Sequence, residues 1–474
     1  DINKEEVVFK EKSTVKIPVQ PPDIQQILST ILEQDSALAM KLLRGALGPS
    51  TDDKGRYLHW DKLRHLTPPG GFTSEQWWVS IKQSRYNLKQ TTSLLNKYGE
   101  FFWYCVPPSL QKELHWLDLH AAGTIQANDA ITNPHSKSTY LVRSLIEESI
   151  NSSQLEGAST TRHVAKEMIR QGRSPSNKSE QMIINNYHAM QFIREIKGDA
   201  LTPSMVFELH RILTENTLDN PAMAGHLRSG SDEITVVDNR DQQILHTPPD
   251  ASELESRMEA LCEFANALDE GGFLHPVIRA ILLHFMLAYD HPFVDGNGRT
   301  ARALFYWSMA HQGYWLMEYI SISAIIKKAP AKYSKAYLYT ESDDDDLTYF
   351  IIHQVEVIRQ SIVDLHAYLD QKMQGIGEAE QLLKDSPRLK KMNFRQLALL
   401  RHALKHPRFA YVVHEHQASH GVAYDTARRD LIDMADKFKL LTKTKQGKNY
   451  LFISPPDLEE RIKHDGVRPA SLAR

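Results

Sequence analysis

The sequence predicts a mainly α-helical protein, and three observations support this fold class. Apolar residues recur every three or four positions along most of the chain, which is the spacing of one helix face. No alternation of strands and helices runs long enough for a parallel sheet. At 41% hydrophobic and 24% charged residues, the chain has enough apolar material for packed cores, which excludes a largely disordered protein.

The length of 474 residues is too great for one core and suggests two to four domains. We expect a helical domain over residues 1–135, a second helical domain over 136–375 and a small domain over 385–460. The 56 Lys and Arg balance 59 Asp and Glu, for a net charge of −3. This balance excludes a polybasic arm, an acidic tail and a general nucleic-acid coat.

Cysteine usage and hydropathy indicate a soluble cytoplasmic protein. Cys105 and Cys262 are too few for a disulfide framework or a four-thiolate zinc site, and they favour a reducing compartment. The longest apolar stretch, Ala280–Tyr289, contains His284 and falls far short of the roughly 20 residues that a membrane helix needs. No signal-peptide pattern opens the chain. We therefore expect no membrane partner.

The first predicted domain begins with a loosely held arm over residues 1–20. Helical spacing starts at Pro21, and small polar residues at 122–138 indicate a linker to the second domain. Tryptophans in a helical layer are more often core than binding surface. We therefore expect the five tryptophans of this domain to be core residues, namely Trp60, Trp77, Trp78, Trp103 and Trp116.

The second predicted domain is helical with one interruption. Asp238-Asn239, within a β-branched stretch at Ile234–Leu245, indicates a short hairpin. Ser179 is the expected N-cap of the helix over 180–196. The other expected helices cover residues 140–156, 203–214, 251–268 and 275–289, a segment from about 299 to 313, and 351–373. The acidic Thr340–Asp346 stretch is expected to form a solvated loop and helix cap.

The run of residues 291–302, H-P-F-V-D-G-N-G-R-T-A-R, carries the chemistry. Pro292 cannot continue the preceding helix, and Gly296 and Gly298 allow positive φ and close approach. The next helix is expected to begin near Arg299. Its free N–H groups and the glycine-rich turn form a nest for an anion.

Charged residues in this run suit a polyphosphate. Arg299 and Arg302 are three apart, so both lie on one side of the helix's first turn. Asp295 supplies a hard oxygen ligand suited to Mg²⁺ bridging two phosphates. The Walker lysine motif is absent. A plain glycine turn with two solvated arginines is the alternative, but so many chemically distinct residues within twelve positions favour a site.

This run matches the H-P-F-x-[DE]-G-N-G-R-x-x-R signature and so resembles Fic-domain proteins. The similarity covers roughly residues 140–370, including Gly225–Arg228 before the hairpin and Pro248-Pro249 after it. The resemblance implies an all-α core with a short β-hairpin flap. It also implies an enzyme that uses Mg²⁺ and ATP to move AMP to a Tyr, Thr or Ser hydroxyl of a target protein, or of itself.

The resemblance also implies roles for individual residues. His291 would be the general base that takes the proton of the target hydroxyl, and Asp295 would hold Mg²⁺. Asn297, with the amides of Gly296 and Gly298, would cradle the α and β phosphates.

The resemblance implies roles for four further residues, two arginines and two residues of an adenine pocket. Arg299 and Arg302 would neutralise the β and γ phosphates and the pyrophosphate leaving group. Tyr337 and Thr340 would close the adenine pocket. His284, on an apolar helix face, is expected to be a core histidine and to have no catalytic role.

The hairpin flap would bind the target by strand addition at Ile234, Thr235 and Val236. A plain structural ribbon is the alternative interpretation of the same residues.

The segment Ser152-Ser-Gln-Leu-Glu156-Gly157 resembles the inhibitory [ST]-x-x-x-E-[GN] motif of Fic-domain proteins. Glu156 would lie in the last turn of a helix, where the dipole disfavours a carboxylate, and the resemblance nominates Arg302 as its partner. Such a pair would block the γ-phosphate position. A solvated surface glutamate is one alternative, and a glutamate that positions water to remove AMP from a modified target is another.

The C-terminal segment has a different composition. Residues 388–448 carry 14 Lys or Arg against five Asp or Glu. A helix at Phe394–Leu404, a turn and second helix at Ser419–Leu431 and a two-strand wing at Leu440–Phe452 resemble a winged helix-turn-helix. Thr426, Arg428 and Arg429 would face a DNA groove. The lysines of the wing that could meet phosphate are Lys443, Lys445 and Lys448.

Two classes of function follow from these patterns. The first is a protein adenylyltransferase held inactive by Glu156. The second is a DNA-binding regulator whose core senses nucleotide or modifies itself, although winged helices also serve in protein contacts and homodimers. A kinase-like variant is disfavoured because Gly296-Asn297-Gly298 is intact, whereas another nucleotide or phosphodiester donor stays open.

Overall fold

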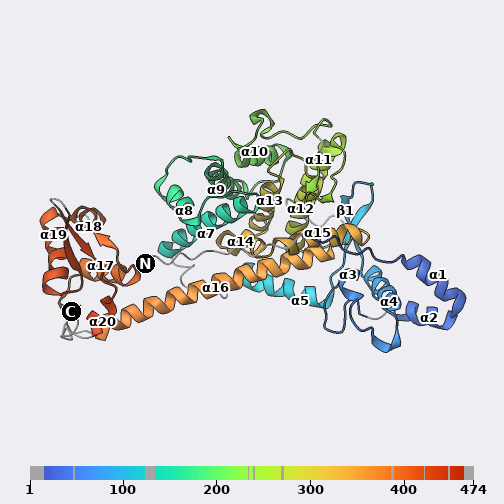
Figure 1. Cartoon of the computed structure of the whole chain (residues 1–474), viewed down its shortest axis with the longest axis horizontal. Helices are drawn as coiled ribbons and strands as arrows, with labels where there is room; N and C mark the ends of the chain where they lie inside the picture. Colours follow the sequence, from blue (N-terminus) through green and yellow to red (C-terminus); the bar gives the residue numbers. More distant parts are fainter. Residues whose placement is uncertain are drawn as a thin grey trace. The chain divides into compact units, whose positions relative to one another are not determined.

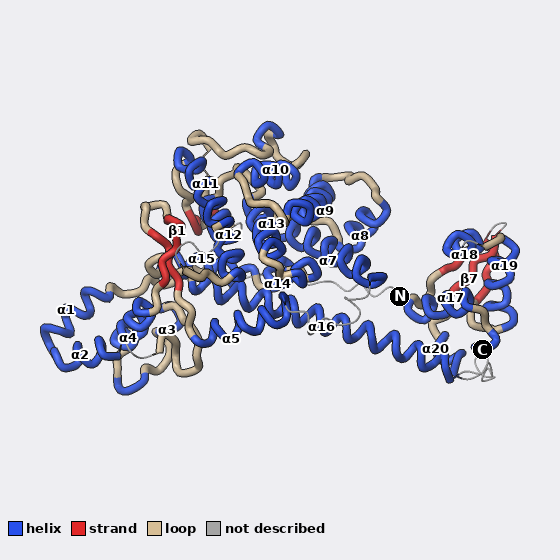
Figure 2. The backbone as a smooth tube through the Cα atoms, turned by 180° about the vertical axis from the view of Figure 1, so that it is seen from behind, coloured by secondary structure: helices blue, strands red, loops and turns tan. Residues whose placement is uncertain are grey.

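The computed structural model describes residues 15–45, 49–122, 134–232, 234–238, 241–267, 272–385, 389–420, 422–446 and 449–463. Helices account for most of these residues and strands for few, which confirms the mainly α fold class (Figures 1 and 2). The chain divides into two compact units, the first ending at Leu365 and the second beginning at His366. The boundary between two helical domains near residue 135 stays a prediction.

The first unit opens with an extended arm and a Trp-rich layer. Trp60, Trp77, Trp78 and Trp103 are buried, as expected of core residues, and Trp116 is half-buried. A β-hairpin, which the sequence patterns did not predict, lies within this otherwise helical segment. The elements are α1 Ile24–Gln34, α2 Ser36–Gly45, α3 Trp60–Leu63, α4 Ser74–Asn87, β1 Gln90–Leu95, β2 Phe101–Tyr104 and α5 Pro108–Leu117.

The middle of the chain packs as a helical bundle around α12 and α13, which lie side by side (Figure 1). Almost every residue of α12 is buried, so this helix lies inside the bundle with protein on all sides. The helices are α7 Pro134–Leu155, α8 Arg162–Gln171, α9 Lys178–Ile196, α10 Pro203–Thr214, α11 Leu254–Asn266, α12 Pro276–Asp290, α13 Asn297–His311, α14 Ile322–Lys328, α15 Pro330–Ser342 and α16 Thr348–Asp385. The short strands β3 Val236–Val237 and β4 Ile244–His246 pair antiparallel.

The N-cap of α9 is Asn177, and the expectation of Ser179 was wrong. The Asn177 side chain accepts a hydrogen bond of 2.9 Å from the Glu180 amide. Ser179 Oγ instead accepts a 3.1 Å bond from the Ser159 amide. The helix therefore begins at Lys178, two residues earlier than the periodicity predicted. Asn is one of the residues preferred at an N-cap, which agrees with the observed start.

The acidic stretch after α15 is not a solvated loop, because Asp343 and Asp346 are buried. Lys82 of α4 donates a 2.7 Å hydrogen bond to Asp343, and both side chains are at most 1% exposed. Tyr349 donates a 2.6 Å bond to the same carboxylate. Burial raises the pKa of Asp343, but Lys82 and Arg85 outweigh burial and hold the pKa below its ordinary value. These ion pairs join the Trp-rich layer to the α15–α16 connection.

Asp343→Ala is expected to lower the free energy of unfolding by about 3–5 kcal/mol, because the buried Lys82 charge loses its buried partner and keeps only Asp344, whose carboxylate lies 3.2 Å away and is largely exposed. Urea unfolding followed by tryptophan fluorescence measures this loss in the layer concerned. The matched control is Asp344→Ala, whose side chain is 60% exposed, with an expected loss of about 1 kcal/mol or less. Equal losses in the two variants would show that the buried pair does not stabilise the layer.

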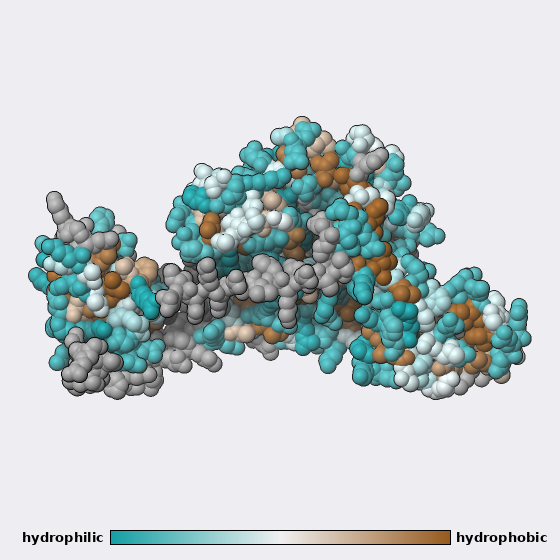
Figure 3. All heavy atoms as spheres, viewed as in Figure 1, coloured by the Kyte–Doolittle hydropathy of each residue, from teal (hydrophilic) through white to brown (hydrophobic). Residues whose placement is uncertain are grey.

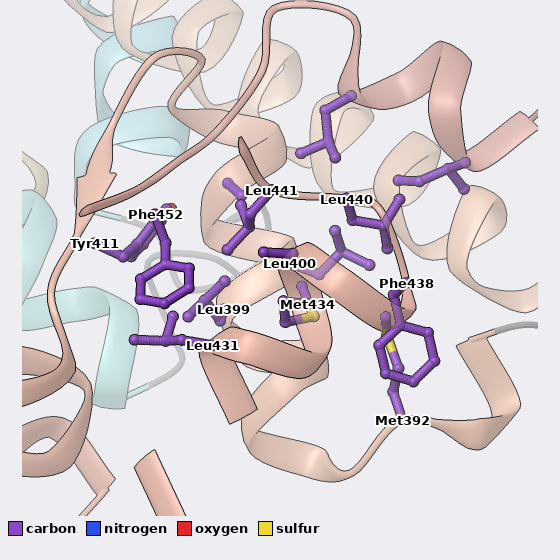
Figure 4. Packing of buried hydrophobic residues seen from close by; sticks show 14 of the residues in the cluster. Met392, Leu399, Leu400, Tyr411, Leu431, Met434, Phe438, Leu440, Leu441 and Phe452 are labelled. Carbon is purple, nitrogen blue, oxygen red and sulfur yellow. The ribbon is translucent and has the colours of Figure 1, made fainter. Parts of the chain in front are cut away.

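The second unit has its own apolar core. Side chains from three helices and the sheet meet there, including Leu400, Leu431, Met434 and Phe452 (Figure 4). Its elements are α17 Phe394–Lys405, β5 Ala410–Tyr411, α18 Val413–His420, α19 Tyr424–Ile432, β6 Thr442–Gln446, β7 Asn449–Ile453 and α20 Leu458–Lys463. The sheet has three strands in the order β5-β7-β6, one more than the predicted wing, and α18 was not predicted.

Figure 3 shows the distribution of hydrophilic and apolar side chains on one face of the protein. Hydrophilic side chains cover most of the visible face of the described residues, with apolar side chains in separate groups (Figure 3). Among the helices of the described residues, none combines the length and the hydropathy required to cross a bilayer.

Candidate functional site

The run of residues 291–302 forms a tight loop between α12 and α13. His291 follows the last residue of α12 in a left-handed conformation, with φ 45° and ψ 54°. Gly296 precedes α13 with φ 87°, a backbone conformation that favours glycine. An added Cβ at Gly296 would also collide with the Thr214 side chain. The loop therefore places His291 beside the N-terminus of α13.

The Asn297 side chain stabilises this loop through hydrogen bonds to its backbone. Its side-chain oxygen accepts a 2.9 Å hydrogen bond from the Phe293 amide, and its side-chain nitrogen donates a 2.8 Å bond to the Phe293 carbonyl. The side chain is buried. Asn297 therefore shapes the loop, and the backbone N–H groups at the start of α13 are of the kind that can bind an anion.

His210 of α10 contacts the loop, and the sequence analysis did not identify it as a site residue. Its Nε2 donates a 2.8 Å hydrogen bond to the Asp295 carbonyl, while its Nδ1 accepts a 2.9 Å bond from the Gly225 amide. Its ring stacks on Phe293 at 3.8 Å. Burial lowers the pKa of His210 to about 4, so the ring is neutral and this donor–acceptor arrangement is maintained at neutral pH.

His210→Gln is expected to flatten the dependence of stability on pH. The unfolded chain binds the His210 proton near pH 6.5 and the folded chain near pH 4, so this residue's contribution to stability is lost as pH falls through that window. The loss amounts to about 3 kcal/mol for a shift of this size. Urea unfolding at several pH values measures the slope. His163→Gln, on an exposed side chain, should leave the slope unchanged.

The protonation of His291 follows from its neighbours. Its Nδ1 lies 3.1 Å from the Ala288 carbonyl, which can only accept, so Nδ1 carries the proton and Nε2 keeps its lone pair. Burial lowers the pKa of His291, which keeps the ring neutral. Arg228 donates a 2.9 Å hydrogen bond to the His291 carbonyl and fixes the backbone.

Arg302 forms a buried cluster with Ser152 and Glu156 of the segment that ends α7. The Arg302 Nε donates a 2.9 Å bond to Ser152 Oγ, and Nη2 lies 2.7 Å from Glu156 Oε1. The Arg302 side chain is 3% exposed and that of Glu156 is 29% exposed. An added Cβ on Gly298 would collide with the same Glu156 oxygen. The carboxylate therefore covers the N-terminus of α13.

The charge of Glu156 suits this position. Burial raises the pKa of its carboxyl, but Arg302, together with Arg299, outweighs burial and holds the pKa below the ordinary value. A carboxylate in this place takes the position expected of an anionic ligand at a helix N-terminus.

Arg299 is buried with spare hydrogen-bonding capacity. Its Nη1 donates a 2.8 Å bond to the Leu213 carbonyl, and its Nη2 lies 3.5 Å from Asp295 Oδ2. Among the described residues, neither its Nε nor its Nη2 has a hydrogen-bond partner. An anion at this place would satisfy both donors.

Asp295 is the one carboxylate of the loop, and its side chain is 53% exposed. Its Oδ1 accepts a 2.6 Å bond from the Gly296 amide, and its other oxygen faces Arg299. Within the described residues, no group of three His, Cys, Asp or Glu is arranged to hold a metal. A single exposed carboxylate fits Mg²⁺, which commonly takes one or two carboxylates together with phosphate oxygens and water.

A cavity of about 200 Å³ joins several of these groups. Glu156, His291, Gly298 and Arg302 line it together with Tyr337. Thr340, expected to close the adenine pocket, is buried elsewhere, where its hydroxyl lies 3.0 Å from the Asp346 carbonyl.

Hydrogen-bonded side chains support the wall of the cavity. Tyr333, another lining residue, lies 3.1 Å from the Tyr337 hydroxyl and 2.8 Å from His284 Nε2. Burial lowers the pKa of His284, so its ring is neutral. His284 is therefore a core histidine behind the cavity wall.

The predicted hairpin forms another wall of the cavity through Val236. Ile234 and Thr235 precede β3 in an irregular conformation. The two-stranded sheet leaves the outer edge of β3 unpaired among the described residues. Asn239, at the expected turn, lies outside the described residues.

Three contacts that sequence patterns did not reveal anchor the hairpin. His246 of β4 lies 2.8 Å from Glu341 of α15 and 2.7 Å from the Tyr289 carbonyl. The amide of Val15, in the N-terminal arm, donates a 2.9 Å bond to Asp238.

The C-terminal candidates lie in the second unit. On α19, Arg428 and Arg429 are exposed and Thr426 is half-buried. Lys443 donates a 2.6 Å bond to Asp436, and Lys445 is exposed. Lys448 lies outside the described residues.

Comparison with known proteins gives a family match. Residues 200–309 match the family model described as "Fic/DOC family". These residues include α10, the hairpin, α12, the loop and most of α13. The match therefore covers His291, Arg302 and His210, and it excludes Glu156 and the second unit.

Curated relatives carry the name "Protein adenylyltransferase Fic". The relative from Nematostella vectensis is 37% identical over 108 residues, covering 23% of this chain and 22% of that protein. The relative from Culex quinquefasciatus is 27% identical over 212 residues, covering 43% of this chain and 39% of that protein. The chain therefore spans between about a fifth and two fifths of these relatives.

Solved structures also resemble the chain. A Fic family protein from Desulfovibrio desulfuricans has a TM-score of 0.48 at 18% identity, covering 74% of this chain and 97% of that one. Residues 134–508 of Fic-1 from C. elegans have a TM-score of 0.43 at 18% identity, covering 75% of this chain and 90% of that one.

Proposed function

We propose that this protein is an adenylyltransferase that moves AMP from ATP to a Tyr, Thr or Ser hydroxyl of a target protein or of itself. The observation that carries the proposal is the meeting of His291, Arg302 and the N-terminus of α13 in one cavity. The match of residues 200–309 to the Fic/DOC family and the names of the relatives support it.

The reaction uses His291 as the general base. The target hydroxyl oxygen attacks the α-phosphorus as its proton passes to His291 Nε2. The bond from the α-phosphorus to the bridging oxygen breaks, and pyrophosphate leaves. Arg302 and Arg299 stabilise the charge that develops on the leaving phosphates, together with the N–H groups of α13. Asp295 would hold Mg²⁺, which would supply positive charge to the phosphates.

The flap is proposed to bind the target next to the base. The free edge of β3 can pair with an extended target segment, with Ile234, Thr235 and Val236 alongside it. Val236 lies in the cavity wall, so a target segment paired there would reach the vicinity of His291.

Labelled ATP tests the proposed reaction. Full-length protein is incubated with ATP labelled at the α-phosphate or the γ-phosphate, alone and with cell lysate. The α label should become protein-bound, and mass spectrometry should find the added mass of AMP on a hydroxyl residue. Transfer of the γ label would indicate a kinase, and absence of both labels from Glu156→Gly protein would refute the proposal.

A second function is proposed for the C-terminal unit on the basis of Arg428 and Arg429. Both are exposed on α19, while Asp430 and Leu431 of the same helix face the core. The order helix, strand, helix, helix, strand, strand supports a winged helix-turn-helix that binds DNA through α19. Salt-dependent binding of the full chain to duplex DNA, weakened by Arg428→Ala/Arg429→Ala, tests it. Unchanged binding, or a dimer without DNA affinity, would refute it.

A further inference from the structure

A second and larger cavity lies in the first unit, with a volume of about 480 Å³. The Trp-rich layer contributes Tyr57 and His59, and α15 and α16 contribute Tyr339 and His353. Its volume lies within the range of about 300–1,000 Å³ that small-molecule sites occupy. The cavity is therefore large enough for an organic ligand.

The second cavity is distinct from the proposed catalytic cavity because α15 separates them. Tyr333 and Tyr337 of this helix line the catalytic cavity, whereas Lys332, Lys335 and Tyr339 line the second one. Residues two apart on a helix point roughly 200° from each other, so the two sets occupy opposite faces of α15. A ligand in one cavity would not contact the residues of the other.

Unpaired positive charge surrounds the second cavity. The lining lysines are Lys16, Lys62, Lys332 and Lys335, against one carboxylate, Glu356. None of these lysines forms an ion pair with another part of the chain that the structure describes. The first three are exposed, so their amines can turn toward a ligand. Such a lining favours an anion.

Aromatic rings form the floor of the cavity. The His59 and Tyr339 rings stack at 4.5 Å with 16° between their planes, and Tyr57 meets Tyr349 edge-on at 5.2 Å. His353 Nδ1 is buried and has no hydrogen-bond partner among the described residues. Flat aromatic walls favour a planar ring, and the free His353 nitrogen offers it a polar contact.

We infer that the second cavity binds a small organic phosphate that carries a planar ring, of the nucleoside monophosphate class. The ring would lie against the aromatic floor and the phosphate among the lysines. Neither feature alone selects this ligand, since an apolar floor would suit any ring and scattered lysines any anion. Their combination in one cavity does.

Protection of lysines from acetylation tests the inference directly. Full-length protein is treated briefly with acetic anhydride, with and without AMP, and acetylation is measured by mass spectrometry. At ten times its dissociation constant, AMP should slow modification of Lys332 and Lys335 by about tenfold. Lys178 and Lys328, exposed lysines that do not line the cavity, should react unchanged. Adenosine and inorganic phosphate, each with half of the ligand, should protect less.

Two variants separate this site from the catalytic cavity. Lys332→Gln/Lys335→Gln should weaken one class of AMP binding in calorimetry by at least about tenfold, whereas the charge-matched Lys178→Gln/Lys328→Gln should not. Arg302→Ala, which alters the catalytic cavity, should leave the lysine protection intact. Loss of protection in Arg302→Ala, equal protection of all lysines, or no protection would overturn the inference. Failure of AMP transfer would leave these readouts unaffected.

Discussion

Replacing His291 with alanine is expected to reduce AMP transfer by about 10²- to 10⁴-fold, the range that a positioned general base contributes. The rate constant should fall while nucleotide binding persists, since the phosphate contacts that we propose come from Arg302, Arg299 and backbone amides. Single-turnover labelling with α-labelled ATP measures the rate, and calorimetry measures the binding.

The dependence of the rate on pH gives a second signature of His291. Burial lowers the pKa of this residue, so the base stays unprotonated to a lower pH than a free imidazole. The apparent pKa of the acid limb of the kcat/KM profile should therefore lie below the ordinary histidine value of about 6.5. An apparent pKa above that value would mean that another group, or a protonated His291, limits the reaction.

His163→Ala serves as the matched control, because its side chain is 82% exposed on α8. It should transfer AMP at the rate of the unaltered protein. If His291→Ala retained that rate as well, His291 would not be the base.

Local chemistry explains why the loop could be predicted from sequence. Pro292, Gly296 and Gly298 act through backbone conformation, which depends on nearest neighbours, so the stop of α12 and the start of α13 follow from residue identity. Periodicity likewise predicted α10 to its final residues, Pro203–Thr214. These features need no knowledge of distant parts of the chain.

Long-range contacts explain what sequence patterns missed. His210 is separated from Asp295 by 85 residues, and Lys82 from Asp343 by 261. Helical spacing places His210 on the apolar face of α10 with Val206 and Leu213, which indicates burial but does not identify its partner. Four consecutive acidic residues normally indicate solvent exposure. Lys82 lies four residues after Trp78 and four before Tyr86 in α4, and this position on an aromatic face was a signal that could have indicated a buried acidic partner.

The assignment of Asn297 shows a limit of a different kind. The signature indicates that this residue matters, but a motif does not distinguish a side chain that contacts ligand from one that holds the loop. The two hydrogen bonds to Phe293 make that distinction in the structure.

Removing the Glu156 carboxylate is expected to raise ATP-dependent labelling by about tenfold or more, which corresponds to 1.4 kcal/mol or more of relieved competition. In the structure, this carboxylate holds Arg302 at 2.7 Å and covers Gly298 at the N-terminus of α13. We propose that a nucleotide phosphate and Glu156 compete for this place. Glu156→Gly removes the competitor and adds no side chain in its place.

Thermal unfolding distinguishes competition from a general effect on folding. In Glu156→Gly, Arg302 keeps its bond to Ser152 but loses the carboxylate that lies 2.7 Å away, so the free variant should unfold at a lower temperature than the unaltered protein. Mg-ATP should then raise its unfolding temperature more than that of the unaltered protein, because the phosphates supply the missing partner. A variant merely loosened by the substitution would gain no extra stabilisation from nucleotide.

Glu215→Gly is the matched control, since Glu215 is also an exposed glutamate that directly follows a helix, α10. It should label no faster than the unaltered protein. If Glu156→Gly also failed to gain activity, the ion pair with Arg302 would not be inhibitory. If Glu156→Gly instead lost the ability to remove AMP from a previously modified target, Glu156 would serve to position water in the reverse direction, and the same cavity would then release the modification.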